Sequence, residues 1–228
     1  MSKLSRCYTA LGRLRTSKGF GIHSPFAFRF VLRTLREKSP YYAYDAITEA
    51  YYVEKYKAKK NYTSLSVGKL LFRVTNYFKP KTILAFGNLE LTESLALMSY
   101  SSKLRMSVVG SVAKYPDFFY TTSFPERIEE TDDRIAAIEK YLSTEEVPFV
   151  FVEHAEKDLA KDLVDKLTMG KYVVIVKNMH KVNANSEFWE ELLLQIDEVN
   201  AGMSFTNGKI GICYFNDKLP LQHFKLWL

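Results

Sequence analysis

Four short apolar runs alternate with helical segments between residues 82 and 199, and this alternation constrains the fold more than any other feature of the sequence. The runs lie at residues 82–86, 105–109, 148–152 and 172–176. Because they do not alternate apolar with polar side chains, they predict a parallel sheet that helices cover on both faces. We expect the helices that separate and follow these strands at residues 89–100, 125–142, 156–167 and 186–199.

A hairpin is predicted at the C-terminal end of the sheet. Two strand-like runs, at residues 203–205 and 210–215, flank the pair Asn207-Gly208, which is a strong hairpin signal. The sequence therefore predicts a doubly wound α/β sheet, mostly parallel, that finishes in an antiparallel hairpin. In open sheets of this kind ligands bind beyond the carboxyl ends of the strands, so the residues directly after each strand are candidates for a site.

The first 80 residues are predicted to be helical, and they carry most of the positive charge. Ser24-Pro25 is a good helix start, since serine caps the first free N–H groups and proline suits the first turn. Two further helical stretches cover residues 41–60 and 63–78, and Pro80 ends the second. Residues 1–81 have a net charge of +13, whereas residues 82–228 have a net charge of −7. We therefore expect a basic helical N-terminal extension over residues 1–80 and an α/β domain over residues 81–228.

The basic extension has two interpretations. It can hold an anionic partner such as nucleic acid, or it can be a solvated face that docks on the acidic body of the chain, for example on Glu129, Glu130, Asp132 or Asp133. The candidate basic contacts are Lys55, Lys57, Lys59, Lys60, Arg29, Arg33 and Arg36. The tyrosines between residues 41 and 56 can form a stacking platform for bases, ordinary packing, or an aromatic surface for oligomerisation.

Several classes of protein and site are disfavoured. Cys7 and Cys213 are far apart, and the four histidines show no metal-ligand spacing, so no metal is expected. The sequence contains no phosphate-binding Gly-x-x-x-x-Gly-Lys loop. No apolar run approaches the ~20 residues of a membrane span. The first residues lack the apolar core of a signal peptide, and we therefore expect a cytoplasmic protein.

One N-terminal segment carries a resemblance to a known family. Gly19-Phe-Gly-Ile-His-Ser-Pro-Phe26 resembles the signature that precedes the methyltransferase domain in a family of class I S-adenosylmethionine-dependent methyltransferase-like proteins common in Bacteroidetes. Glu187-x-Trp189, residues 209–215 and Gln222-His-Phe224 are similar to later segments of that family. The resemblance covers most of the chain. It implies a Rossmann-like methyltransferase fold and an O-methyltransferase activity on a small-molecule acceptor.

The cofactor motifs of that family are degraded in this chain. The first motif is an acidic residue, any residue, glycine, three residues and glycine, and only Gly87 matches it, with Ala85 and Leu91 at the other positions. After the second strand, Gly110-Ser111 stands where the family has an acidic residue for the cofactor ribose. After the fourth strand, the family has Asp-Gly followed by His, and here the chain reads 153–156 as Glu-His-Ala-Glu.

The fifth strand is followed by a pair of aspartates in the family, often tied to metal or substrate. This chain has Lys177-Asn178 there, and His180 keeps a matching place. Losing a ribose carboxylate removes charge-assisted hydrogen bonds worth about 1.5–3 kcal/mol each, so we expect weak or absent binding of S-adenosylmethionine. The predicted function is a methyltransferase-like protein with weak or lost activity. The alternative is a non-catalytic binding protein that holds an anionic partner with its N-terminal helices.

The strand ends and the resemblance together define the candidate site. Its predicted cofactor contacts are Gly87, Asn88, Glu90, Gly110 and Ser111, its acid–base pair is Glu153 and His154, and its substrate or anion contacts are Lys177, Asn178, His180 and His23. Ordinary structural roles compete with these assignments. Glu153 and His154 can be a solvated strand end, Lys177 a surface lysine that replaces a carboxylate, and His23 a structural histidine beside a helix start.

Overall fold

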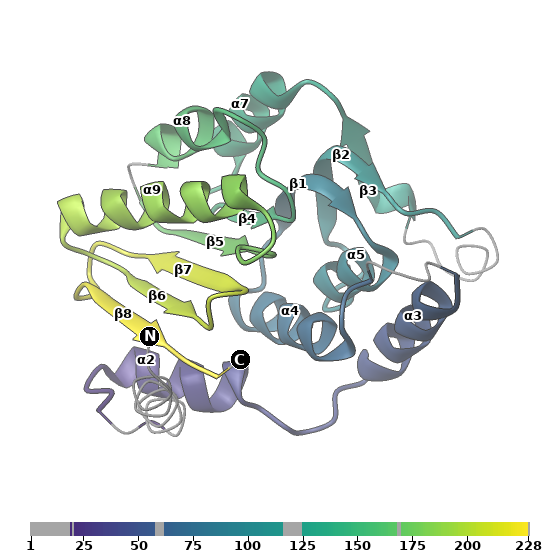
Figure 1. Ribbon diagram of the computed structural model, residues 1–228, viewed down its shortest axis with the longest axis horizontal. Coiled ribbons are helices and arrows are strands. Elements are labelled where there is room, and N and C mark those ends of the chain that lie inside the picture. Colours follow the sequence, from purple (N-terminus) through teal and green to yellow (C-terminus); the bar gives the residue numbers. More distant parts are fainter. Residues whose placement is uncertain (1–18, 20, 58–61, 116–124, 168–169, 228) are drawn as a thin grey trace.

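The computed structural model describes residues 19, 21–57, 62–115, 125–167 and 170–227, and Figure 1 shows one sheet with helices around it. The strands are β1 (Thr82–Leu89), β2 (Arg105–Val112), β3 (Ile128–Thr131), β4 (Phe149–Val152), β5 (Tyr172–Val176), β6 (Met203–Thr206), β7 (Gly211–Phe215) and β8 (Gln222–Lys225). Their order across the sheet is β3-β2-β1-β4-β5-β7-β6-β8. Strand order reverses between β1 and β4, which is where such sheets bind ligands.

The pairing of the strands confirms the predicted fold class. Strands β3, β2, β1, β4 and β5 are parallel, whereas β7 runs antiparallel to both β5 and β6. Asn207-Gly208 lies between β6 and β7, as the hairpin signal predicts. Strand β8 was not predicted, and it pairs with β6 in parallel at the edge of the sheet.

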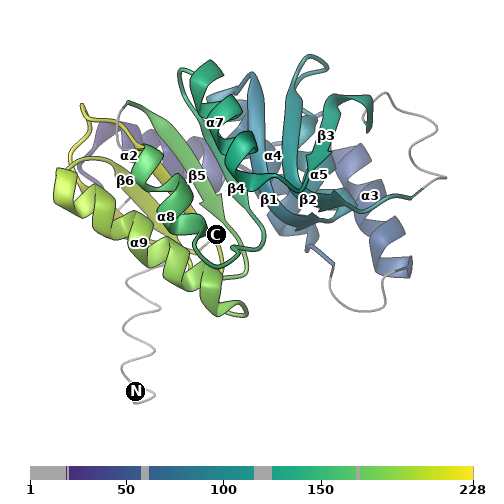
Figure 2. The same cartoon turned by 90° about the horizontal axis from the view of Figure 1, so that it is seen from above.

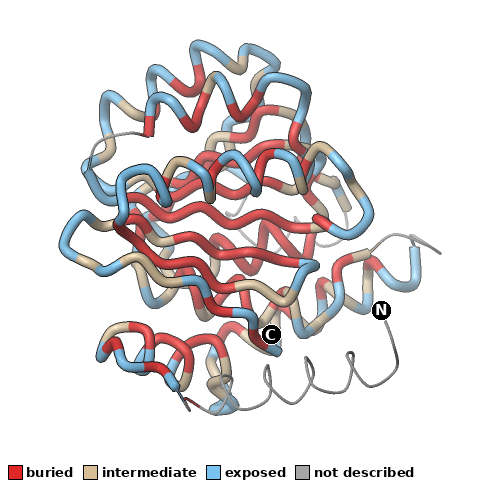
Figure 3. Tube along the Cα trace, turned by 60° about the vertical axis from the view of Figure 1, so that its left-hand side comes forward, coloured by how far each residue is buried: buried red, intermediate tan, exposed pale blue. Residues whose placement is uncertain are grey.

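Helices cover both faces of the sheet, and Figure 2 shows the two layers. They are α2 (Pro25–Phe30), which continues as the π-helical turn η1 (Val31–Leu35), α3 (Tyr44–Lys57), α4 (Leu65–Phe78), α5 (Leu91–Met98), the short turn η2 (Pro125–Arg127), α7 (Arg134–Thr144), α8 (Leu159–Leu163), the short turn η3 (Asp165–Leu167) and α9 (Asn183–Val199). Helices α2 to α5 share one apolar core with the sheet, and α7, α8 and α9 share the other. The buried strands form the centre of the molecule in Figure 3.

The N-terminal helices begin where their caps predict and pack directly on the sheet. The Ser24 hydroxyl accepts a hydrogen bond from the backbone N–H of Ala27 at 3.3 Å, and Pro25 follows it as the first helical residue. The ring of Phe30 lies 5.0 Å from the ring of Phe205 in β6. None of the helices in the described ranges has the length and apolar character that a membrane span requires.

The helix predicted at residues 125–142 was wrong in its first part and right from Arg134 onward. This segment contains the turn η2, strand β3 and the first part of α7. Ile128 pairs with Met106 of β2, so the polar segment after η2 is extended because it forms an edge strand. The Asp133 carboxylate then accepts a hydrogen bond from the N–H of Ala136 at 3.0 Å, which starts α7 at Arg134.

Arg73 of α4 ties the N-terminal helices together. Its Nε donates to the carbonyl of Thr34 at 2.7 Å, and its two terminal nitrogens donate to the carbonyl of Leu35 at 2.9 Å and to the hydroxyl of Tyr44 at 3.1 Å. A lysine keeps the charge but cannot reproduce this three-way geometry. We expect Arg73→Lys to lower the free energy of unfolding by about 1–3 kcal/mol, measured by urea denaturation.

Arg29→Lys is the matched control for this substitution. The Arg29 side chain is exposed, and its Nε donates to the carbonyl of Pro25 in the same helix at 3.2 Å. We expect the control to change the free energy of unfolding by no more than about 0.5 kcal/mol. Equal losses in the two variants would show that Arg73 does not hold these helices together.

Candidate functional site

Four of the predicted cofactor residues pair with one another across two strands. Strand β1 was expected to end before Gly87 but continues to Leu89, and it pairs with β2 along its whole length. Gly87 lies opposite Gly110, and Asn88 lies opposite Ser111. The Ser111 hydroxyl donates to the side-chain oxygen of Asn88 at 2.8 Å. The extended pairing leaves a single residue, Glu90, between β1 and α5.

The backbone at Gly87 is tightly enclosed. Gly87 and Gly110 have φ values of +106° and +128°, in the range that favours glycine. A methyl group on Gly110 would collide with the carbonyl oxygen of Gly87. Strand β4 encloses Gly87 on the side away from β2. A methyl group on Gly87 would lie 2.8 Å from the backbone nitrogen of His154 and 2.9 Å from Oε2 of Glu153, the two residues that follow β4. Neither strand can carry a larger residue here.

A buried ion pair joins the end of β5 to the first turn of α5. The Lys177 ammonium contacts Oε1 of Glu93 and donates to the hydroxyl of Thr63 at 2.8 Å. The Thr63 hydroxyl in turn donates to the same Glu93 oxygen at 2.6 Å. Glu93 is fully buried, and Lys177 is only 9% exposed. Lys177 is therefore a buried lysine with a carboxylate partner, and the surface position considered from the sequence was wrong.

Two further carboxyl groups lie at the same end of α5. Glu90 caps the helix in a reciprocal arrangement with Glu93, whose Oε2 accepts from the backbone N–H of Glu90 at 3.2 Å. Glu90 also accepts a hydrogen bond from the backbone N–H of Thr63. Glu54 of α3 accepts from the N–H of Thr92 at 3.2 Å and from its hydroxyl at 2.5 Å. The buried cluster thus brings together α3, α5, β5 and the segment before α4.

Burial sets the protonation behaviour of this cluster. Burial and the charge of Glu93 raise the pKa of Glu90 to about 7, against the opposing effect of Lys177. Burial also raises the pKa values of Glu54 and Glu153. Burial opposes the charge on Lys177, but the surrounding carboxylates outweigh it and raise the pKa of the ammonium. The cluster therefore holds one permanent positive charge beside three carboxyls, those of Glu54, Glu90 and Glu153, that lose their protons only above their ordinary range.

The ends of β4 and β5 are joined by two asparagines. Asn178 has a positive φ of 59°, and its side chain donates to Oε1 of Glu153 at 3.1 Å. The buried Asn185 of α9 donates to the carbonyls of Glu153 at 2.7 Å and Lys177 at 2.6 Å. It also accepts from the N–H of Ala155 at 2.6 Å. These bonds fix the direction in which the Glu153 side chain leaves the sheet.

A cleft of about 520 Å³ opens beside this cluster at the carboxyl edge of the sheet. Its lining includes Thr63, Glu90, Glu153, Lys177, Asn178 and Lys209. We call it the carboxyl-edge cleft. The segments that form it are the start of α4, the residues after β1, β4 and β5, and the turn between β6 and β7.

The structure brings together five of the predicted site residues in the carboxyl-edge cleft. They are Glu90, Glu153, Lys177, Asn178 and His180. His154 lies next to Gly87, on the neighbouring strand ends. His23 is exposed and lies elsewhere, because its neighbour Ser24 contacts Met203 at the start of β6, on the opposite edge of the sheet.

The sequence analysis missed four residues of the cluster: Glu54, Thr63, Glu93 and Asn185. The pattern Glu90-x-x-Glu93 before an apolar run is a helix-capping signal that could have identified Glu93. Glu54 and Thr63 carry no such local signal, since only the packing of α3 and α4 against α5 brings them to the site.

Comparison with solved structures identifies the fold, while no family model and no curated protein matches the chain. An S-adenosylhomocysteine-bound methyltransferase, PaMTH1 of Podospora anserina, is 12% identical, with a TM-score of 0.51 over 86% of this chain and 98% of that one. TomG, an O-methyltransferase of Streptomyces achromogenes in complex with S-adenosylmethionine, is 12% identical, with a TM-score of 0.49 over 78% and 90%. The O-methyltransferase of Bacillus cereus, in complex with S-adenosylhomocysteine, is 12% identical, with a TM-score of 0.47 over 82% of this chain and 95% of that one. The match to PaMTH1 shows that the chain has a Rossmann-like methyltransferase fold.

The raised pKa of Glu90 gives a testable dependence of stability on pH. The folded protein holds this proton to about pH 7, whereas the unfolded chain releases it near the ordinary carboxyl pKa of 4.5. Between these values the folded state binds more protons, so stability falls as pH rises. We expect Glu90→Gln to remove about 1–3 kcal/mol of that fall, measured by urea unfolding at pH 4.5, 6 and 8.

The matched control is Glu146→Gln, which changes an exposed carboxyl before β4. We expect the control to follow the pH profile of the wild-type protein. The Glu90→Gln variant should become more stable than the wild type at pH 8, because its neutral amide carries no buried charge. Parallel profiles for the wild type and Glu90→Gln would contradict the proposed titration of Glu90.

Proposed function

We propose that the protein is O-methyltransferase-like, that its binding of S-adenosylmethionine and its methyl transfer are weak or lost, and that its carboxyl-edge cleft takes a different small ligand. The observation that carries the proposal is the enclosed backbone at Gly87. In the family that the sequence resembles, the glycine at the position of Gly87 lets the cofactor approach the backbone closely. Here Gly110 lies on one side of Gly87, and Glu153 and His154 lie on the other.

The residues at this edge do not fit the cofactor in the usual way. Ser111 stands at the position of the ribose carboxylate, and its hydroxyl is hydrogen-bonded to Asn88. Leu91, at the position of the second motif glycine, is fully buried in the core. Losing the carboxylate hydrogen bonds alone weakens binding by about tenfold to a hundredfold.

The Lys177 ammonium supports the same proposal. It stands after β5, where the resembling family has aspartates tied to metal or substrate. A positive charge at this place repels a metal ion and pairs with the chain's own Glu93 instead. In the family that the sequence resembles, this edge of the sheet would hold metal, acceptor and cofactor. Here its side chains bind one another, and the carboxyl-edge cleft lies beside them.

Calorimetric titration with S-adenosylmethionine and S-adenosylhomocysteine tests the proposal. We expect no binding in the low-micromolar range for the wild-type protein. Ser111→Asp returns one carboxylate but no room at Gly87, so we expect this variant to remain without such binding as well. Low-micromolar affinity in the wild type, or S-adenosylmethionine that copurifies with it, would overturn the proposal.

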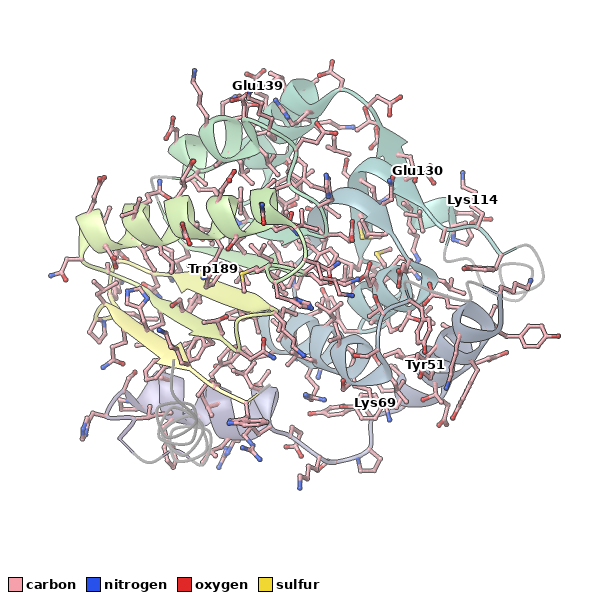
Figure 4. All side chains as sticks on the ribbon, in the orientation of Figure 1. Tyr51, Lys69, Lys114, Glu130, Glu139 and Trp189 are labelled. Carbon is pink, nitrogen blue, oxygen red and sulfur yellow. The ribbon has the colours of Figure 1, made fainter. Side chains whose placement is uncertain are left out.

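A second candidate function is the binding of a polyanion by α3, and the exposure of its tyrosines favours it. Tyr52 and Tyr56 are 60% and 88% exposed, and the Lys55 ammonium lies 5.6 Å from the ring centre of Tyr51, labelled in Figure 4. By contrast, Tyr41 and Tyr44 pack against Phe72, with ring centres 5.3 and 5.9 Å away. Exposed aromatic rings interleaved with cations are typical of surfaces that bind single-stranded nucleic acid.

Three of the four acidic groups considered as partners for the arginine row have other contacts. Glu130 pairs with Lys114 at 3.2 Å, as Figure 4 shows at the edge of the sheet, and Glu129 pairs with Lys140 at 3.0 Å. Asp133 caps α7. Arg29 and Arg33 are exposed, whereas Arg36 is half-buried.

Replacing Lys55, Lys57, Lys59 and Lys60 with glutamine tests this second candidate; Lys59 and Lys60 lie outside the described residues. We expect the variant to elute from heparin and from immobilised RNA at lower salt than the wild type, because counterion release drives such contacts. Lys157→Gln/Lys161→Gln, on the exposed surface at α8, is the control for a change of charge elsewhere. Absence of wild-type retention at roughly 50 mM salt, where screening is weak, would rule the function out.

A further inference from the structure

The carboxyl-edge cleft has its positive charge at the outside. Lys181 follows β5 and Lys209 lies in the turn between β6 and β7; both are exposed and both line the cleft. Neither ammonium forms an ion pair within the part of the chain that the structure describes. His180 lies beside them, and burial together with these two lysines lowers its pKa. The outer part of the cleft therefore offers two positive charges to an anionic group.

The inner part of the cleft has the opposite character. Glu90 and Glu153 line it and are half-buried, while Lys177, which also lines it, directs its ammonium to Glu93 and Thr63. A carboxylate can accept about four hydrogen bonds. Glu153 receives one at Oε1 from Asn178, so the inner part retains capacity to accept from a ligand. An anion placed here would meet two carboxyl groups and be repelled once they ionise.

We propose that the carboxyl-edge cleft binds a zwitterionic small molecule, with its acidic group on Lys181 and Lys209 and its amine on Glu153 and Glu90. The inference rests on the proposed function, because it needs a cleft free of S-adenosylmethionine. The volume of about 520 Å³ is in the usual range for small-molecule sites. A ligand with only a negative charge would be repelled by the carboxylates of the inner part, and a ligand with only a positive charge by the lysines of the outer part.

The first experiment compares matched probes by protein-observed NMR titration of the full chain. The probes are ω-amino acids from 4-aminobutyrate to 8-aminooctanoate, with the alkyl carboxylate and the alkylamine of equal length as single-charge controls. We expect the best amino acid to bind at least about tenfold more tightly than either matched control. Equal affinity for the carboxylate, or no binding by any amino acid of the series, would overturn the proposal.

Two variants test the two ends separately. We expect Lys181→Gln/Lys209→Gln to weaken the amino acid and the carboxylate by about tenfold and to leave the amine unchanged. Glu153→Gln should weaken the amino acid and the amine but not the carboxylate. Lys157→Gln/Lys161→Gln has the same change of net charge away from the cleft and should bind like the wild type.

The two lysine variants also show which results would contradict the proposal. An equal loss in Lys157→Gln/Lys161→Gln, or no loss in Lys181→Gln/Lys209→Gln, would show that the binding is non-specific. The lysine variants change exposed side chains, so their folding is not at risk if Glu153→Gln proves unstable. The probes contain neither sulfonium nor adenosine, so their binding and the S-adenosylmethionine titration succeed or fail independently.

Discussion

The contact between Lys177 and Glu93 holds the carboxyl edge of the sheet together. Burying two charges costs more than their attraction returns unless further hydrogen bonds satisfy them. Thr63 meets that need, because its hydroxyl accepts from Lys177 and donates to Glu93. The backbone N–H of the same threonine binds Glu90. The end of β5, the start of α5 and the segment before α4 are therefore fixed relative to one another by one network, and the shape of the carboxyl-edge cleft depends on it.

The long β1–β2 ladder explains why Glu90 takes part in this network. Because β1 runs on to Leu89, only Glu90 remains to connect it to α5, so no loop can curve around a ligand at this place. The connecting residue must cap the helix, and a carboxylate does so well because the N-terminal N–H groups attract negative charge. Glu90 is half-buried at this place: burial raises its pKa to about 7, while the nearby Lys177 ammonium favours its ionised form. The residues between β1 and α5 thus form a local structure with its own requirements.

The sequence predicts the parts of this structure that local patterns control. The central strands are continuous apolar runs and the hairpin has Asn207-Gly208, so both were predictable. Strand β3 is polar and β8 is short, and each is extended because a neighbouring strand pairs with it, which no local pattern shows. The same division applies to the site. Glu153 and Lys177 follow strands whose carboxyl ends must meet, whereas Glu54 and Thr63 reach the cluster through the packing of helices.

The titration of Glu90 connects the stability of the fold to the occupant of the cleft. Above pH 7 the ionised carboxyl is a half-buried negative charge that destabilises the folded chain. An amine beside Glu90 stabilises that charge and lowers the pKa of the carboxyl, so ligand binding and proton release are linked. The acidic end of the ligand lies on the exposed lysines and has no part in this exchange. The two ends of a zwitterion therefore act differently. The acidic end is attracted to exposed lysines, and salt screens this attraction. The amine stabilises the ionised Glu90 carboxyl, which destabilises the folded chain at alkaline pH when the cleft is empty.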